Sequence, residues 1–119
     1  MNLKYFTLEE FDSPDLPNSG VNMDSDFLTM LDKAREIAGI PFKINSGYRT
    51  KEGNQKANGK KDSSHLIGKA SDIACSGSRE RWIILDSLIQ VGFNRIGIAD
   101  TFIHVDSDES KSPNVIWTY

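Results

Sequence analysis

The stretch SSHLIGKASD at residues 63–72 and the shorter stretch FIHVD at residues 102–106 hold both histidines of the chain. His65 and Asp72 lie seven residues apart in the first stretch, and His104 is at the centre of the second. A catalytic zinc site takes three protein ligands from His, Asp, Glu or Cys and keeps one open position. His65, Asp72 and His104 supply such a set, so the first hypothesis is a metal site.

The residues around this set favour convergence of the three side chains. Gly68 permits a turn after His65, and Ala70 leaves room for close packing before Asp72. In the second stretch His104 shares one face of an expected strand with Asp106, because side chains alternate with a period of two. Either histidine alone is more often a core residue bonded to a neighbour, but the combined set favours ligands.

Composition narrows the class of protein. With 119 residues the chain is long enough for one core and too short for two ordinary domains. The formal net charge of -3 gives no basis for nucleic-acid binding, and no apolar run is long enough to cross a bilayer. The single cysteine, Cys75, excludes an internal disulfide. We expect synthesis in the cytoplasm because the N-terminus lacks the apolar segment of a signal peptide.

Periodicity predicts the elements. A capping-box pattern predicts a helical turn from Thr7, helical spacing predicts helices at 25–38 and 78–91, and a polar segment at 50–58 is a candidate short helix. Alternation predicts strands at 41–45, 72–75, 95–99 and 101–105. We therefore expect an α+β fold in a single domain spanning 1–119, with a small, mainly antiparallel sheet flanked by helices. Residues 1–23 would form an N-terminal arm packed on it.

The pattern from Ser63 to Asp72 resembles the signature of the zinc D-alanyl-D-alanine metallopeptidases, a cell-wall peptidase family that shares its fold with the hedgehog signalling domain. Further similarity to the small single-domain peptidoglycan peptidases of phages and bacteria lies in YFTLEEF at 5–11, INSGYR at 44–49, FIHVD at 102–106, and in Asn54 with Gly59. The resemblance covers almost the whole chain and predicts the hedgehog-like, D-Ala-D-Ala peptidase-like fold.

The resemblance implies Zn²⁺ on His65, Asp72 and His104. Arg49 matches the family arginine that holds substrate near the scissile bond, with a supporting buried salt bridge as the alternative. Ser63 matches the motif serine, which would hydrogen-bond a ligand or the substrate unless it is a plain turn residue.

The catalytic base is not found where the resemblance would place it. Better-known branches carry an acidic residue three positions before the last histidine or a histidine two positions before it, and here those positions hold Thr101 and Phe102. The candidates are Asp100, if a β-bulge at 99–101 brings it into register, and Asp106 on the face of His104. Asp106 would alternatively orient Arg49 or a metal ligand.

The resemblance implies a zinc-dependent hydrolase of the murein-hydrolase type, which cuts peptidoglycan stem peptides or cross-bridges next to a D-amino acid as a carboxypeptidase or an endopeptidase. A weak zinc module that binds wall peptide or a protein partner is the second hypothesis, and a metal-free virion or tail component is the third. The loops at 50–62 and 106–114 would set specificity. We expect a monomer that reaches the wall after lysis, delivery or virion assembly, as a phage endolysin does.

Overall fold

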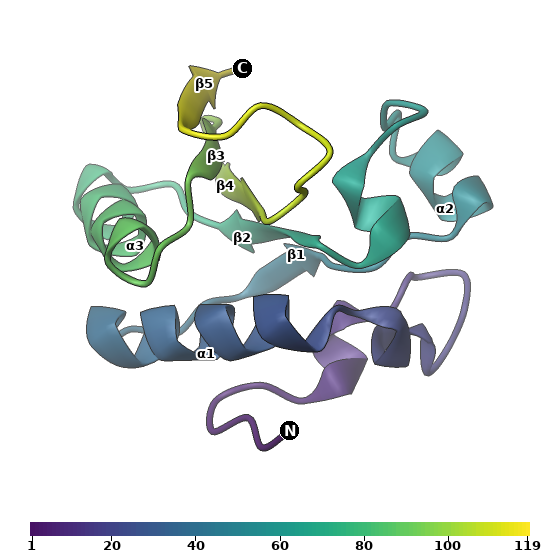
Figure 1. The fold of residues 1–119 in the computed structure, drawn as a ribbon, viewed down its shortest axis with the longest axis horizontal. Coiled ribbons are helices and arrows are strands. Elements are labelled where there is room, and N and C mark those ends of the chain that lie inside the picture. The colour runs from purple at the N-terminus through teal and green to yellow at the C-terminus, as the bar shows by residue number, and fades with distance from the viewer.

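A five-stranded sheet forms the centre of the chain, and the computed structural model describes every residue from Met1 to Tyr119 (Figure 1). Its strands follow the order β1-β2-β4-β3-β5, and every neighbouring pair is antiparallel except β3 and β5. The strands are β1 (Ile44–Ser46), β2 (Ala70–Ala74), β3 (Arg95–Ile98), β4 (Phe102–Asp106) and β5 (Val115–Thr118). The predicted α+β class with a mainly antiparallel sheet is confirmed.

Three α-helices and three 3-10 helices accompany this sheet. The α-helices are α1 (Ser25–Ala38), α2 (Lys51–Lys56) and α3 (Ser78–Gln90), and the 3-10 helices are η1 (Leu8–Phe11), η2 (Ser19–Asn22) and η3 (Ser64–Ile67). Helix α1 begins where the Asp24 carboxylate accepts the N–H of Phe27, and it ends at Gly39, which has a φ of 69°. The bounds of α1, α2 and α3 agree with the sequence prediction to within two residues, whereas η2 and η3 were not predicted.

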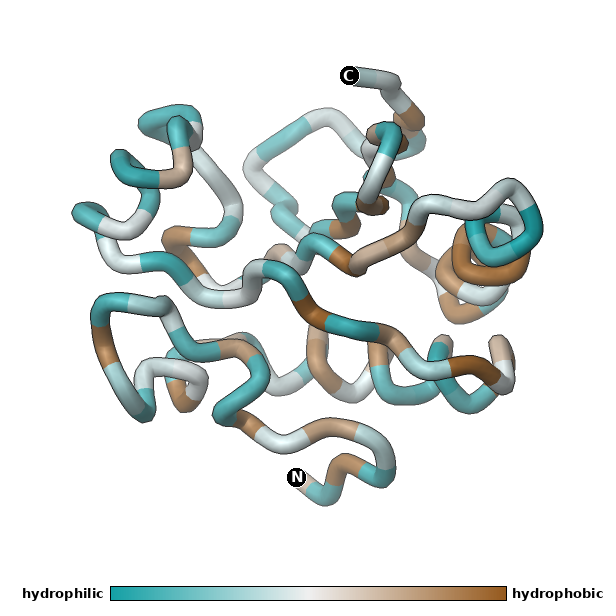
Figure 2. The backbone as a smooth tube through the Cα atoms, turned by 180° about the vertical axis from the view of Figure 1, so that it is seen from behind, coloured by the Kyte–Doolittle hydropathy of each residue, from teal (hydrophilic) through white to brown (hydrophobic).

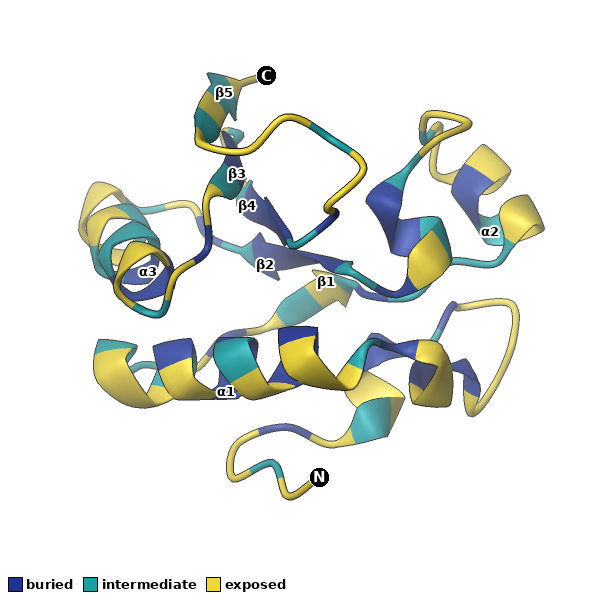
Figure 3. Ribbon diagram, in the orientation of Figure 1, coloured by how far each residue is buried: buried dark blue, intermediate teal, exposed yellow.

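The core lies between one face of the sheet and the helices α1 and α3. It joins apolar side chains of the three central strands to the inner faces of the two helices; among its buried members are Ile73, Ile96, Ile103, Val105, Phe27, Leu28, Leu31, Ile84 and Leu88. The buried sides of both helices face the sheet (Figure 3). Apolar segments gather there, whereas α2 and the loop after it are mostly hydrophilic (Figure 2). The opposite face of the sheet is thereby left to polar side chains.

The N-terminal arm packs against this scaffold. The N–H of Thr7 donates to the Glu10 carboxylate at 2.7 Å, which forms the helical turn expected there as η1. Phe6 and Phe11 are buried and meet edge to face, with ring centroids 5.3 Å apart. The carbonyl of Phe11 accepts the N–H of Tyr48 at 2.9 Å. The arm therefore supports the segment after β1, which contributes to the site described next.

Several details differ from the sequence prediction. Strand β1 begins at Ile44, later than the strand predicted at 41–45, and β2 begins at Ala70, before the strand predicted at 72–75. The β-bulge at 99–101 that would bring Asp100 into register is absent: the N–H of Ala99 donates to the carbonyl of Phe102 across a tight turn at 3.0 Å. The C-terminal segment was not predicted as a strand, yet it pairs in parallel with β3 as β5. No helix is both long and apolar enough to cross a membrane.

Candidate metal centre and cleft

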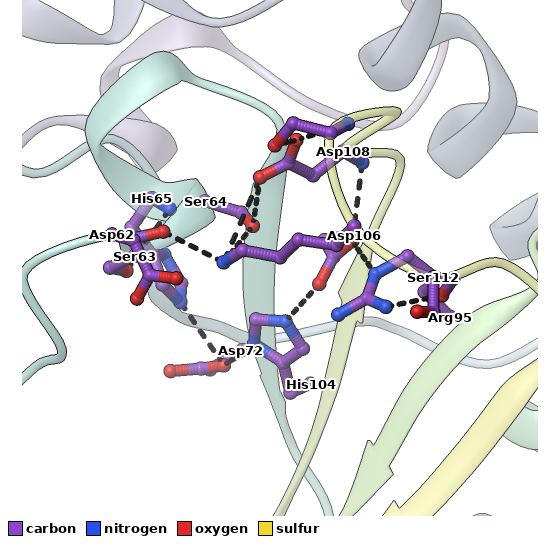
Figure 4. Close-up of polar contacts among 12 residues, drawn as sticks. Asp62, Ser63, Ser64, His65, Asp72, Arg95, His104, Asp106, Asp108 and Ser112 are labelled. Atoms are coloured by element: carbon purple, nitrogen blue, oxygen red, sulfur yellow. Dashed lines mark hydrogen bonds and ion pairs between the residues drawn. The ribbon is translucent and has the colours of Figure 1, made fainter.

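Three side chains converge on the open face of the sheet. Asp72 on β2 lies directly opposite His104 on β4, and His65 approaches from η3. Asp72 Oδ1 is 3.0 Å from His104 Nδ1 and 3.4 Å from His65 Nε2, and the ligand atoms all lie within 4.8 Å of one another (Figure 4). The structure thus brings together the three residues that the sequence singled out as metal ligands.

The donor set fits zinc. Tetrahedral zinc with N and O ligands at about 2.0–2.1 Å holds those ligands about 3.3 Å apart, close to the two separations to Asp72. In each histidine, the ring nitrogen that points away from Asp72 (the outer nitrogen) has a hydrogen-bond partner. His65 Nδ1 lies 2.7 Å from the carbonyl oxygen of Gly47, and His104 Nε2 lies 2.8 Å from Asp106 Oδ2. With protons on those outer nitrogens, the inner lone pairs face the centre. The site is therefore set up for a cation.

Local structure explains why the motif has this form. The hydroxyl of Ser63 accepts the N–H of His65 at 3.2 Å and caps η3. Gly68 ends η3 with a φ of 70°, and a Cβ there would lie 2.3 Å from the carbonyl oxygen of Asn22. Only glycine satisfies both conditions. The expected turn at Gly68 is confirmed, and Ser63 acts here on the backbone of the loop that carries His65.

The charges of the metal-free site favour a positive species at its centre. Burial alone would raise the pKa of Asp72, but hydrogen bonds from His104 and His65 outweigh it and lower that pKa far below its usual value. Burial alone would lower the pKa of His104, but Asp106 and Asp72 raise it above its usual value. Both shifts show that the centre of the site favours positive charge.

Arg49 lies beside the ligand carboxylate. Its guanidinium donates to Ser46 Oγ at 2.9 Å, to Asn54 Oδ1 at 3.2 Å and to Asp72 Oδ2 at 3.3 Å. Gly59 leaves room for this arrangement, because a Cβ there would lie 1.9 Å from Asn54 Oδ1. Three of the five N–H groups of Arg49 are used in these bonds. Arg49 therefore supports Asp72, and its remaining N–H groups are available to a ligand in the cleft, because Arg49 lines that cleft.

The two candidate bases occupy different places. Asp106 is 1% exposed, and its Oδ1 accepts Arg95 Nε at 2.7 Å and the N–H of Asp108 at 3.2 Å. Its Oδ2 faces His104. Asp100 is exposed in the turn between β3 and β4, and it is not among the residues that line the cleft. The structure therefore brings Asp106, but not Asp100, to the ligand set.

Four functional candidates were missed from sequence. Arg95 holds Asp106, and Asp108 accepts Ser64 Oγ at 2.7 Å, which ties the loop after β4 to η3. Trp117 and Tyr119, from the unpredicted C-terminal strand and the residue after it, line the cleft. The apolar run from Val115 to Trp117 is the sequence signal that could have found the last two.

A cleft of ≈ 930 Å³ opens above the ligand atoms. A smaller hollow of ≈ 310 Å³ adjoins it and shares Arg49, Ala57, Asp72 and Phe102 with it. The larger part has cations on its walls, among them Lys60 and Lys111. The two hollows therefore meet beside Asp72.

Comparison with known proteins agrees with this geometry. A family model described as Peptidase M15 matches residues 4–106. The chain therefore belongs to the Peptidase M15 family, which makes it a member of a family of zinc D-alanyl-D-alanine peptidases. A search of curated proteins found no match. The matched range contains all three ligand candidates and ends at Asp106, before Trp117 and Tyr119.

Proposed function

We propose that the chain is a zinc-dependent peptidase that hydrolyses peptide bonds of peptidoglycan next to D-amino acids. The observation that carries this proposal is the convergence of His65 Nε2, Asp72 Oδ1 and His104 Nδ1 at the floor of an open cleft. Family membership supports peptide hydrolysis as the reaction. A wall peptide, as stem or cross-bridge, is the proposed substrate.

The residues of the site have different proposed roles. A zinc ion on the three ligands would supply an activated water and polarise the scissile carbonyl. Arg49 holds Asp72 from one side and offers its free N–H groups to a substrate carbonyl or carboxylate. Asp106, held by Arg95, keeps the outer nitrogen of His104 protonated, so we assign Asp106 a positioning role in place of base catalysis.

The two hollows favour an endopeptidase over a carboxypeptidase. They meet at Asp72, with volumes of ≈ 310 and ≈ 930 Å³. Substrate residues on both sides of the scissile bond fit the cleft better.

A second candidate function has one observation in its favour. Both oxygens of Asp106 already have partners, and Asp100 lies outside the cleft, so neither expected base is free. A zinc module that binds wall peptide or a protein partner without turnover would show the same arrangement.

Digestion of purified peptidoglycan separates the two. The zinc-loaded chain should release fragments whose masses identify a cut next to a D-amino acid, and chelator or His65→Ala should abolish their release. Intact wall beside one bound zinc per chain would support the binding module and contradict the peptidase.

A further inference from the structure

One transverse row of the sheet joins the metal ligands to the C-terminal strand. Asp72 on β2 pairs with His104 on β4, His104 pairs with Gly97 on β3, and Gly97 pairs with Trp117 on β5. Gly97 carries no side chain, and a Cβ there would lie 2.5 Å from Trp117 Nε1. The indole therefore lies across β3 and reaches His104, with ring centroids 5.5 Å apart.

The indole is fixed on a second side by a cation. Arg95 Cζ lies 5.2 Å from the Trp117 ring centroid, within the range of a cation–π contact. The same guanidinium is bonded to Asp106, the carboxylate that holds His104. Trp117 thus belongs to the support of a metal ligand, although it lies outside the matched family range.

Tyr119 lies two residues further along the chain, on the same side as Trp117. Its N–H donates to the carbonyl of Ile98 at 3.3 Å, which continues the pairing of β5 with β3. Its ring meets that of Phe102 with centroids 5.3 Å apart, and the residue lines the cleft that holds the ligand atoms. Although 71% of the residue is exposed, these contacts place its ring at the cleft wall.

The carboxylates of the metal site affect the pKa of the Tyr119 phenol. Burial raises the pKa of Tyr119, the Trp117 side chain lowers it by hydrogen bonding, and the carboxylates of Asp72 and Asp106 raise it further. The group therefore keeps its proton at neutral pH. No side-chain or backbone acceptor in the protein takes that proton, so it is available to a ligand in the cleft.

We propose that Tyr119 is a further catalytic residue whose phenolic O–H donates a hydrogen bond to the carbonyl oxygen of the scissile bond. The bond strengthens as that oxygen gains negative charge in the tetrahedral transition state, which is how oxyanion donors accelerate acyl transfer. The proton stays on Tyr119 throughout, so no further acid or base is needed for this contribution. Trp117 is a positioning residue for the phenol. The inference rests on the proposed peptidase function.

The experiment compares Tyr119→Phe with wild type. This variant removes the hydroxyl and keeps the ring that packs on Phe102. Tyr5→Phe is the matched control, because Tyr5 lies in the N-terminal arm against Arg35, away from the cleft. Zinc content, kcat and KM on a wall peptide, and the Kd of a phosphinate analogue of that peptide are measured for all three proteins.

Tyr119→Phe should keep one zinc and lose about 10²-fold in kcat with KM little changed, as for the loss of one oxyanion donor. Its Kd for the tetrahedral phosphinate should weaken, while its Kd for the cleaved product should not. Equal kcat and equal phosphinate affinity in Tyr119→Phe and an active wild type would overturn this inference alone. A wild type that neither cleaves the peptide nor binds the phosphinate would overturn the proposed function as well.

Discussion

Asp106→Asn tests how the carboxylate beside His104 acts, because the structure dictates how the new amide must orient. Oδ1 of Asp106 accepts two N–H donors, from Arg95 and from the backbone of Asp108. The amide oxygen of the variant must take that position, since an NH₂ group there would face two donors. The NH₂ group then faces His104 Nε2, which in the wild type lies 2.8 Å from Oδ2.

A neutral imidazole that accepts at Nε2 carries its proton on Nδ1, the atom that faces the metal position. Binding zinc then requires either the unfavourable tautomer or a flipped amide that leaves buried donors unsatisfied, at about 1–3 kcal/mol. That cost corresponds to a loss of about 5- to 150-fold in zinc affinity, in line with the 10- to 100-fold typical of residues that orient a metal-ligating histidine. The histidine in the wrong tautomer is the same fault that an asparagine causes beside a catalytic histidine.

The assay is a competitive zinc titration against a chromophoric chelator at neutral pH. Asp26→Asn is the matched control, because it makes the same change at an exposed position in the first turn of α1. Circular dichroism and thermal melting of the metal-free proteins report whether the fold is kept. Zinc affinity of Asp106→Asn within twofold of wild type would refute the positioning role.

Four further results are expected. The raised pKa of His104 stabilises the metal-free fold below about pH 6.5, and this stabilisation is lost as the pH rises through the folded-state pKa. Zinc binds only the neutral ring, so the rise in melting temperature on adding zinc should grow from pH 5 to pH 8. A rise that does not change with pH would contradict this. Asp108→Ala should lower the free energy of unfolding by about 1–3 kcal/mol in urea titrations, because it leaves the proton of the buried Ser64 hydroxyl without its acceptor. A change under 0.5 kcal/mol would contradict a stabilising role for this hydrogen bond. Gly97→Ala should displace Trp117, seen as a change in indole fluorescence and weaker zinc binding, whereas an unchanged spectrum would contradict the close approach. Arg49→Lys should keep zinc yet reduce kcat/KM about tenfold or more, since an ammonium cannot reproduce the planar set of donors; equal activity would show that its donors do not matter.

The convergence of the three candidate metal ligands could be predicted from sequence because the residues around them carry local structural signals. His65 lies between a serine cap and a glycine turn, and Asp72 and His104 lie on strands with clear alternation. Such signals depend on neighbours in the chain, so a single sequence contains them. The same holds for the helices α1 and α3, whose caps and apolar spacing are local.

The role of Asp106 was only partly predictable. Alternation placed it on the face of His104, but not which oxygen would face which donor. Arg95 comes from the neighbouring strand β3, and its ion pair with Asp106 depends on the register of β3 against β4. Sequence alone therefore left base and support as open alternatives.

The C-terminal strand was not predicted because its position also depends on pairing with a distant segment. Its four residues pair in parallel with β3, and its side chains are exposed or half-buried, so hydrophobic patterning is weak. The indole of Trp117 occupies the space that a side chain at position 97 would fill. This contact joins two segments that are far apart in the sequence. Tertiary context of this kind is visible only in the folded chain.

The most direct test of the account titrates metal-free protein with zinc while the release of new amino groups from purified peptidoglycan is followed. We predict that activity rises in proportion to added zinc and reaches a plateau at one equivalent per chain, with no activity at any zinc level for His104→Ala. Hydrolysis that survives chelation, or no hydrolysis although one zinc is bound, would contradict a catalytic zinc on His65, Asp72 and His104.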